Sequence, residues 1–158
     1  MLFHLGRENT VGQNSRLRLE DGTIRWTGVP DNSAPPTGPF DPDLPVMGFR
    51  RAGGSVAALL FGHSTHTIGA LSGNVRSPAF YGMAAQAIEG QLGAVTLFLE
   101  GASGSTHNLT LKPPQAEQAI RTAVLATWKS ATPLSVKRVG SIKREIAVSV
   151  RRFDEAKE

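Results

Sequence analysis

Two apolar runs that each break into a polar, histidine-containing loop constrain the fold of this 158-residue chain more than any other feature. Residues 95–99 run into the small, polar loop 101–108, and residues 56–61 run into the loop 62–67. These loops hold three of the four histidines: His63, His66 and His107. Continuous apolar runs of this length are typical of strands that are buried on both faces. We therefore expect two buried strands, each ending in a loop where polar chemistry can sit.

A well-delimited helix lies between these two runs. Ser77 is expected to cap it, Pro78 suits its first position, and Gly93 stops it. One helical face is apolar and can pack on a sheet; it carries Phe80, Ala84, Ala87, Ile88 and Leu92. A strand-helix-strand unit joins parallel strands by a right-handed crossover, so both polar loops leave the same edge of the sheet. Because open parallel sheets bind ligands at this edge, we expect His63 and His107 to meet in a site there.

The amino-terminal part of the chain predicts an antiparallel hairpin. Asp21-Gly22 is a strong two-residue turn signal. With that turn, one face of the hairpin pairs Leu17 with Trp26 and Leu19 with Ile24, and the other face carries Arg18 and Arg25.

The remaining segments complete a single domain. Residues 113–131 predict a second helix, and alternating apolar residues over 134–137 and 145–151 predict a second hairpin. Six of the ten prolines fall in 27–45, which excludes regular secondary structure there. The chain therefore divides into an N-terminal segment and hairpin (1–26), a Pro-rich excursion (27–45) and an α/β core (46–153). The predicted fold is α/β, with a mixed sheet, a central parallel strand-helix-strand unit and antiparallel hairpins at the margins.

Composition limits the function classes. The chain has no cysteine, which excludes disulfides and thiolate zinc sites. Its net charge of +4 comes from basic residues in 137–152, where aromatic side chains do not interleave as a nucleic-acid platform requires. This stretch predicts the solvated face of a hairpin, and contact with a phosphate or an anionic membrane surface is the alternative. We see no signal peptide and no apolar run long enough to span a bilayer, so we expect a soluble chain. The sequence indicates neither the compartment nor the oligomeric state.

Three chemistries fit the two loops. In the first, His63, with His107 or His66, holds zinc and its bound water. The alternative is that the same histidines and hydroxyl groups only order the loops by hydrogen bonding. In the second, Ser103 or Ser105 acts as a nucleophile with a histidine, although the loop departs from the Gly-x-Ser-x-Gly elbow. In the third, the backbone amides of 101–106 bind an anion, since small residues permit close approach.

The same loops, together with segments upstream, resemble the amino-terminal domain of the neutral/alkaline, non-lysosomal ceramidase family. The resemblance runs in order from about residue 11 to residue 108. It rests on Gly12-Gln13-Asn14-Ser15-Arg16, Phe40-Asp41-Pro42-Asp43-Leu44-Pro45-Val46, Phe61-Gly62-His63-Ser64-Thr65, residues 77–84 and Phe98-Leu99-Glu100-Gly101-Ala102-Ser103-Gly104. Each of these motifs is loose, and their order and spacing are more specific than any one of them.

The resemblance implies zinc-dependent hydrolysis of the amide bond of N-acylsphingosines. It makes His63 a zinc ligand and places Arg16, or Ser15, near the arginine that contacts substrate or the developing oxyanion. The loop 101–107 takes the place of the loop that carries the nucleophile. This chain departs from the family's Gly-Asp-x-Ser-Pro, because His107 stands where the serine falls and Ser105 where the aspartate falls; Ala79 likewise replaces a frequent aspartate.

The resemblance also implies metal ligands that lie outside these residues, namely an upstream histidine motif and a downstream glutamate and tyrosine. The chain is thus expected to be part of a larger catalytic domain. The predicted function is a ceramidase-like, zinc-dependent amide hydrolase with a lipid amide substrate, incomplete in this chain. Its candidate catalytic residues are Arg16, Ser103, Ser105 and His107, and its candidate metal ligands are His63, His66 and His107. The alternative is a non-catalytic α/β domain that binds an anion or a partner through Gly101 to His107.

Overall fold

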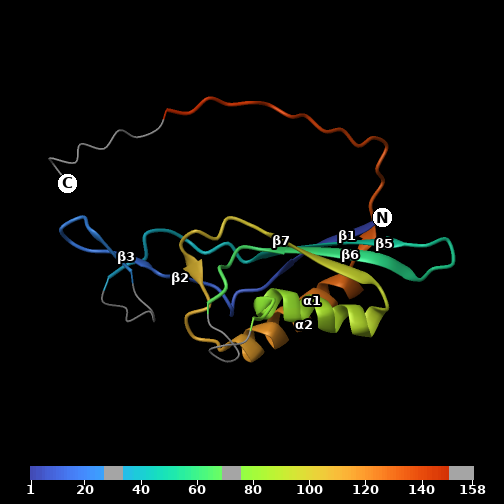
Figure 1. Ribbon diagram of the computed structural model, residues 1–158, viewed down its shortest axis with the longest axis horizontal. Coiled ribbons are helices and arrows are strands. Elements are labelled where there is room, and N and C mark those ends of the chain that lie inside the picture. The colour runs from blue at the N-terminus through green and yellow to red at the C-terminus, as the bar shows by residue number, and fades with distance from the viewer. Residues whose placement is uncertain (27–33, 69–75, 150–158) are drawn as a thin grey trace.

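The computed structural model describes residues 1–26, 34–68 and 76–149, and Figure 1 shows its elements. The strands are β1 (Leu2–Arg7), β2 (Gln13–Asn14), β3 (Arg16–Arg18), β4 (Ile24–Trp26), β5 (Asp43–Arg50), β6 (Val56–His63), β7 (Val95–Glu100), β8 (Thr106–His107) and β9 (Thr132–Pro133). The helices are α1 (Ala79–Leu92) and α2 (Pro113–Lys129). Residues 27–33 of the Pro-rich segment and the end of the predicted second hairpin, from residue 150, lie outside the described residues. The prediction that 27–45 holds no regular secondary structure is wrong for its last three residues, because β5 begins at Asp43.

A five-stranded mixed sheet forms the centre of the molecule, in the order β7-β6-β5-β1-β9. β6 and β7 are parallel and are joined by α1, and every other neighbouring pair is antiparallel. Two small antiparallel sheets, β3-β4 and β2-β8, stand beyond one end of the main sheet (Figure 1). The predicted fold class is therefore confirmed.

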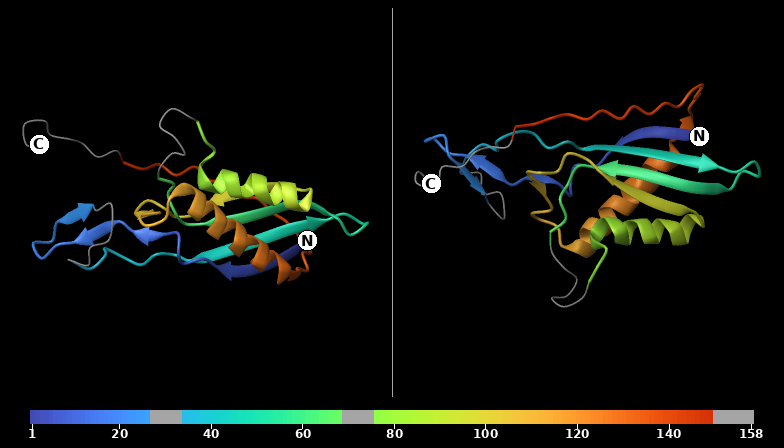
Figure 2. Two further views of the ribbon diagram at one scale, coloured as in Figure 1. Left: turned by 90° about the horizontal axis from the view of Figure 1, so that it is seen from below. Right: turned by 45° about the horizontal axis from the view of Figure 1, so that its top comes forward.

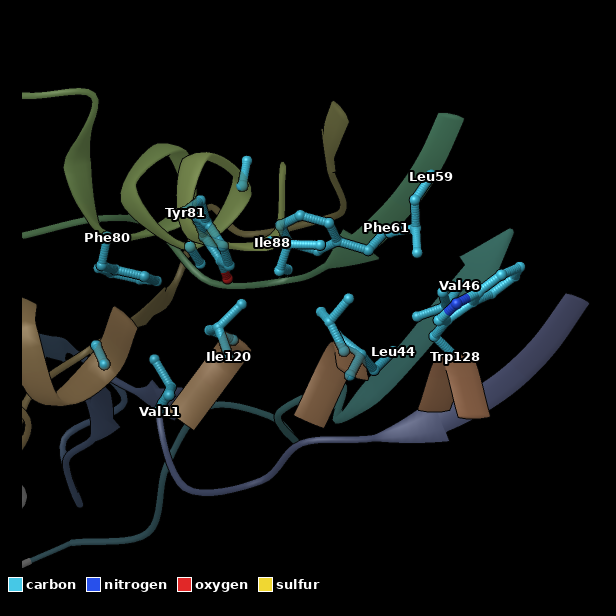
Figure 3. Packing of buried hydrophobic residues seen from close by; sticks show 14 residues of the cluster. Val11, Leu44, Val46, Leu59, Phe61, Phe80, Tyr81, Ile88, Ile120 and Trp128 are labelled. Atoms are coloured by element: carbon cyan, nitrogen blue, oxygen red, sulfur yellow. The ribbon is translucent and has the colours of Figure 1, made fainter. Parts of the chain in front are cut away.

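Both helices cover the same face of this sheet (Figure 2). Between the layers lies the hydrophobic core, which includes Leu59 of β6 and in which Phe61 of β6 points toward Ile88 of α1, while Val46 of β5 meets Trp128 of α2 (Figure 3). At Gly48 the Trp128 ring occupies the position that a Cβ would take, so the close approach of α2 to β5 depends on this glycine. The core thus anchors both strands that lead into the site.

The boundaries of α1 follow the predicted signals with one shift at the start. Pro78, not Ser77, holds the cap position, and the Ser77 hydroxyl accepts a hydrogen bond from the amide of Ala79 at 3.2 Å. At the other end Gly93 adopts a left-handed conformation with φ of 62° and ends the helix as predicted. Of the predicted apolar face, Phe80, Ala84 and Ile88 are buried in the core.

The amino-terminal hairpin forms with a register one residue away from the prediction. Trp26 pairs with Arg16, and Leu17 pairs with Arg25. The cause is a longer turn: the Asp21 carboxylate accepts hydrogen bonds from the amide and hydroxyl of Thr23, and the chain reverses over one residue more than a two-residue turn. A shift of one residue moves each side chain to the other face, so Trp26 leaves the face of Leu17.

The prediction of strands buried on both faces is wrong for β7. This strand lies at the edge of the sheet, and its outward side chains Val95, Leu97 and Leu99 are 56%, 50% and 58% exposed. Only the side chains that point toward the helices are covered, as at Thr96. The described residues place no layer over the opposite face.

The predicted second hairpin is also wrong within the described residues. Residues 134–149 form no strand, and every one of them is exposed. β9 pairs with β1 over two residues, and the amide of Leu134 donates to the carbonyl of Met1 at 3.1 Å. A two-stranded hairpin without an apolar surface beneath it is marginally stable in water, which explains why alternation alone does not produce one here.

Within the described part of the chain, neither helix is long and apolar enough to cross a membrane.

Candidate functional site

The loops that follow β6 and β7 meet at the carboxyl edge of these parallel strands, as the sequence predicts. The amide of Gly101 donates to the carbonyl of His63 at 3.0 Å, and the amide of His66 donates to the carbonyl of Thr106 at 2.8 Å. β8, at the end of the second loop, also pairs with β2, which brings residues 13–16 to the same place. Three segments far apart in the sequence therefore form one polar cluster.

Two histidines lie side by side in this cluster. The ring centroids of His66 and His107 are 5.4 Å apart, and the two residues form an isolated parallel bridge. The Nδ1 atom of His66 is 3.0 Å from the Ser103 hydroxyl, and that of His107 is 2.9 Å from the Ser15 hydroxyl. Each ring is thus held by a serine at the same nitrogen.

The hydrogen-bond network around Ser15 determines the tautomer of His107. The Ser15 hydroxyl accepts the indole N–H of Trp26 at 3.0 Å and donates its own proton to the carbonyl of Ser105 at 3.1 Å. A hydroxyl has one proton, so Nδ1 of His107 must be the donor to Ser15. The other ring nitrogen, Nε2, then carries a lone pair.

The same reasoning holds for His66. The Ser103 hydroxyl donates to Oε1 of Glu100 at 2.6 Å, so Nδ1 of His66 donates to Ser103. No described residue gives the Nε2 atom of His66 or of His107 a hydrogen-bond partner. Metal-binding histidines have this pattern, in which one ring N–H is fixed by an acceptor and the other nitrogen is free.

The electrostatic surroundings keep His107 neutral. Burial lowers its pKa, and the nearby His66 and Arg16 lower it further. Arg16 therefore lies close enough to His107 to act on its charge. A neutral imidazole is the form that can donate its lone pair to a metal or accept a proton.

His63 has a different environment from the other two loop histidines. It is 1% exposed, and its Nδ1 atom is 2.6 Å from the Tyr81 hydroxyl while Nε2 is 3.2 Å from the carbonyl of Glu8. Burial raises the pKa of Tyr81, which therefore stays protonated and donates to Nδ1, and Nε2–H donates to Glu8. Burial also lowers the pKa of His63, with Glu8 and Asp41 opposing it. Both ring nitrogens are thus already in use.

The described residues supply only some of the ligands that a catalytic zinc ion needs. Two imidazoles bound to one tetrahedral zinc at about 2.0 Å have ring centroids about 5 Å apart, which is close to the separation of His66 and His107. Binding through His63 would require it to give up its bond to Tyr81 or Glu8. Among residues 1–26, 34–68 and 76–149, no group of three or more His, Cys, Asp or Glu side chains could hold a metal ion. Catalytic zinc sites use three protein ligands, so the histidine pair is a partial ligand set.

The serines do not have the geometry of a catalytic triad. Ser103 is 7% exposed, and the Glu100 carboxylate is 3.6 Å from Nδ1 of His66, the nitrogen that faces the serine. In a triad the carboxylate orients the ring through the other nitrogen. Ser105 contributes its backbone carbonyl to Ser15. Ser103 and Ser105 therefore serve to order the loop 101–107 in this arrangement.

Sequence reasoning missed several residues of the cluster. Trp26 contacts Ser15 because of the shifted hairpin register. Glu8, directly after β1, and Tyr81, on α1, both contact His63. Tyr81 follows Phe80 directly and carried no separate signal. The family resemblance makes Ser15 an alternative to Arg16, but the contact of Ser15 with a histidine 92 residues away cannot be predicted without the pairing of β2 with β8.

Two solved structures share this arrangement of elements. One is a ceramidase complexed with C2, with a TM-score of 0.60 and 17% identity, and the other is the neutral ceramidase from Pseudomonas aeruginosa, with a TM-score of 0.57 and 20% identity. The chain shares its fold with part of neutral ceramidase. In both cases the match covers 81% of this chain and 22% of the other, so the chain spans about a fifth of their length. No protein-family model and no curated protein sequence matches the chain. At these identities the similarity to the ceramidases establishes the fold.

Proposed function

We propose that the chain carries part of the active site of a ceramidase-like, zinc-dependent amide hydrolase that acts on a lipid amide. The observation that supports this most strongly is the pair His66 and His107, each with Nδ1 fixed by a serine and Nε2 free. The pair lies at the carboxyl edge of two parallel strands, in a fold shared with neutral ceramidases.

In this proposal His66 and His107 hold the zinc. His63, which the family resemblance makes a ligand, supports the loop from beneath unless it exchanges its bond to Tyr81 or Glu8 for the metal. Further ligands come from residues beyond those that the structure describes. When bound, zinc supplies a Lewis acid that polarises the amide carbonyl.

The chain's own residues have three tasks in the reaction. Ser15 and Ser103 fix the orientation of the two histidines, and Trp26 and Glu100 in turn fix the serines. Arg16, beside His107, stabilises negative charge as it develops on the carbonyl oxygen. The ordered loop 101–107 forms the wall against which substrate is held.

One observation favours a second candidate function, a non-catalytic domain that binds an anion or a partner through the loop 101–107. The described residues supply two histidines and no third metal ligand beside them. An arginine, small residues and a closed hydrogen-bonded loop are sufficient for binding. Metal dependence separates the two functions, because only the hydrolase requires it.

Hydrolysis of a fluorogenic short-chain N-acylsphingosine tests the proposal. We expect activity that increases with added zinc, is abolished by a chelator, and falls at least about 100-fold in His66→Gln and His107→Gln. The matched control is His4→Gln, which changes an exposed histidine on β1. Activity of folded parent protein that is absent at every zinc concentration would favour the binding domain.

A further inference from the structure

The face of the main sheet opposite the helices is apolar and uncovered by the described residues. Its side chains form rows that cross the strands: Phe3 of β1 pairs with Met47, Met47 with Leu60, and Leu60 with Leu97. A second row runs from Phe49 through Ala58 to Val95. We name this surface the open face, and define it by Phe3, Leu5, Pro45, Met47, Phe49, Ala58, Leu60, Val95, Leu97 and Leu99. Contiguous apolar surfaces of this kind mark interaction sites.

The amino-acid sequence of β7 also indicates that a second layer covers the open face. A strand with one solvated face alternates apolar and polar residues, whereas β7 is apolar at three consecutive positions, Leu97, Phe98 and Leu99. Phe98 packs against the core, so the apolar residues on either side of it are explained only by a second layer. The question is which segment provides that layer.

Among the described residues, the segment 134–149 carries a series of unburied apolar side chains that could cover the open face. Val139, Ile142, Ile146 and Val148 are 80% to 87% exposed. The segment leaves the sheet at β9 and runs on the side opposite α1 and α2, toward the end of the sheet that carries β2 and β3 (Figure 1). It thus starts at one edge of the open face and already lies on the correct side of the sheet.

The length and the charge of residues 134–149 also suit the open face. At about 3.3 Å per residue, an extended chain covers about 30 Å between Pro133 and Ile142, slightly more than the eight-residue strand β6. This would bring Lys143 and Arg144 to the end of the open face where Asp41 and Glu100 line a pocket of about 400 Å³. The segment carries four basic side chains and one acidic side chain, so its charge complements these carboxylates.

We propose that residues 134–144 dock on the open face of their own sheet as an extended strap that buries Val139 and Ile142. The docked strap would close the pocket beside Ser64 and Glu100 and form a wall next to the histidine cluster. This inference is independent of the proposed function, because it rests only on the two unburied apolar surfaces.

The absence of cysteine allows a direct cross-linking test in the full chain. The double variant Leu99→Cys/Ile142→Cys places one thiol on the open face, beside the pocket where the docked strap would bring Ile142, and one on the strap. The control Gln91→Cys/Ile142→Cys places the first thiol at an exposed position of α1, on the covered side of the sheet. Under mild oxidation we expect an intramolecular disulfide to form at least about tenfold faster in the first variant. Equal rates, or cross-links only between two chains, would overturn the proposal.

Binding of an apolar fluorescent dye provides a second test that needs no new thiols. The variant Val139→Asp/Ile142→Asp should release the strap and raise dye fluorescence several-fold, while Ser135→Asp/Ser141→Asp adds the same charge at polar positions and should leave it unchanged. An equal response in both pairs, in proteins whose far-ultraviolet circular dichroism matches the parent, contradicts docking. Anionic vesicles test the competing case, in which the strap binds a membrane. Burial of the apolar side chains of the strap only when vesicles are present would assign the strap to a membrane surface.

Discussion

At the scale of single residues, two histidines three positions apart in one loop have opposite surroundings. His63 is buried with both ring nitrogens bonded inside the protein, while His66 has one nitrogen fixed by Ser103 and the other free. The sequence shows that both follow a buried strand, but it cannot show which side chain points into the core. That depends on the pleat of β6, which turns His63 toward Tyr81 on α1.

The buried position of His63 predicts a pH dependence of stability. Its folded-state pKa is lowered, so the unfolded chain, with a histidine pKa of about 6.5, binds more protons than the folded chain. Stability from His63 is therefore fully present above about pH 6.5 and is lost as the pH falls through the folded-state pKa. Urea unfolding between pH 5 and pH 8 should show this loss in the parent and a shallower loss in His63→Gln. An unchanged slope in His63→Gln, with His4→Gln as control, would contradict it.

Removal of the Tyr81 hydroxyl should destabilise the protein by about 1–3 kcal/mol, because Nδ1 of His63 would lose its donor in a buried site. The measurement is the free energy of unfolding of Tyr81→Phe. In His63→Gln the same change should cost less, since the partner ring is already absent. Equal costs in the two backgrounds would mean that the two side chains do not interact.

At the scale of elements, the β6-α1-β7 unit could be predicted because each part carries a local signal: apolar runs for the strands, Pro78 and Gly93 for the helix ends. The hairpin of β3 and β4 was predicted with the wrong register, because the Asp21 side chain lengthens the turn. Alternation alone predicts strands over 134–137 and 145–151. Alternation reports which side chains need burial, and pairing depends on a partner strand that the local sequence does not reveal.

Two glycines test how closely the layers pack. Gly48→Ala places a methyl group against the ring of Trp128 and should destabilise the protein by about 1–3 kcal/mol. Gly90→Ala, in α1 with no atom within 4 Å of the added carbon, should be neutral or stabilising by about 0.5–1 kcal/mol. Chemical unfolding of both variants measures the difference. Similar values for the two would show that α2 does not approach β5 as described.

At the scale of the whole molecule, one sheet face carries the helices and the core, and the other face is apolar and open in the described residues. The site lies at the end of this sheet, where loops from three parts of the chain meet. Sequence reasoning predicted the place of this site from the handedness of the crossover. It did not predict the pairing of His66 with His107, because that pairing depends on the bridge between two loops rather than on either loop.

The central claim is that His66 and His107 together bind zinc, and the most direct test is the zinc content of the purified, dialysed chain by elemental analysis. We predict zinc bound by the parent and by His4→Gln, and loss of that zinc in both His66→Gln and His107→Gln. His63→Gln should retain zinc if its ring is structural, and lose it if the ring exchanges its internal bonds for the metal. A folded parent that holds no zinc, or zinc that remains when both His66 and His107 are replaced, would contradict the claim.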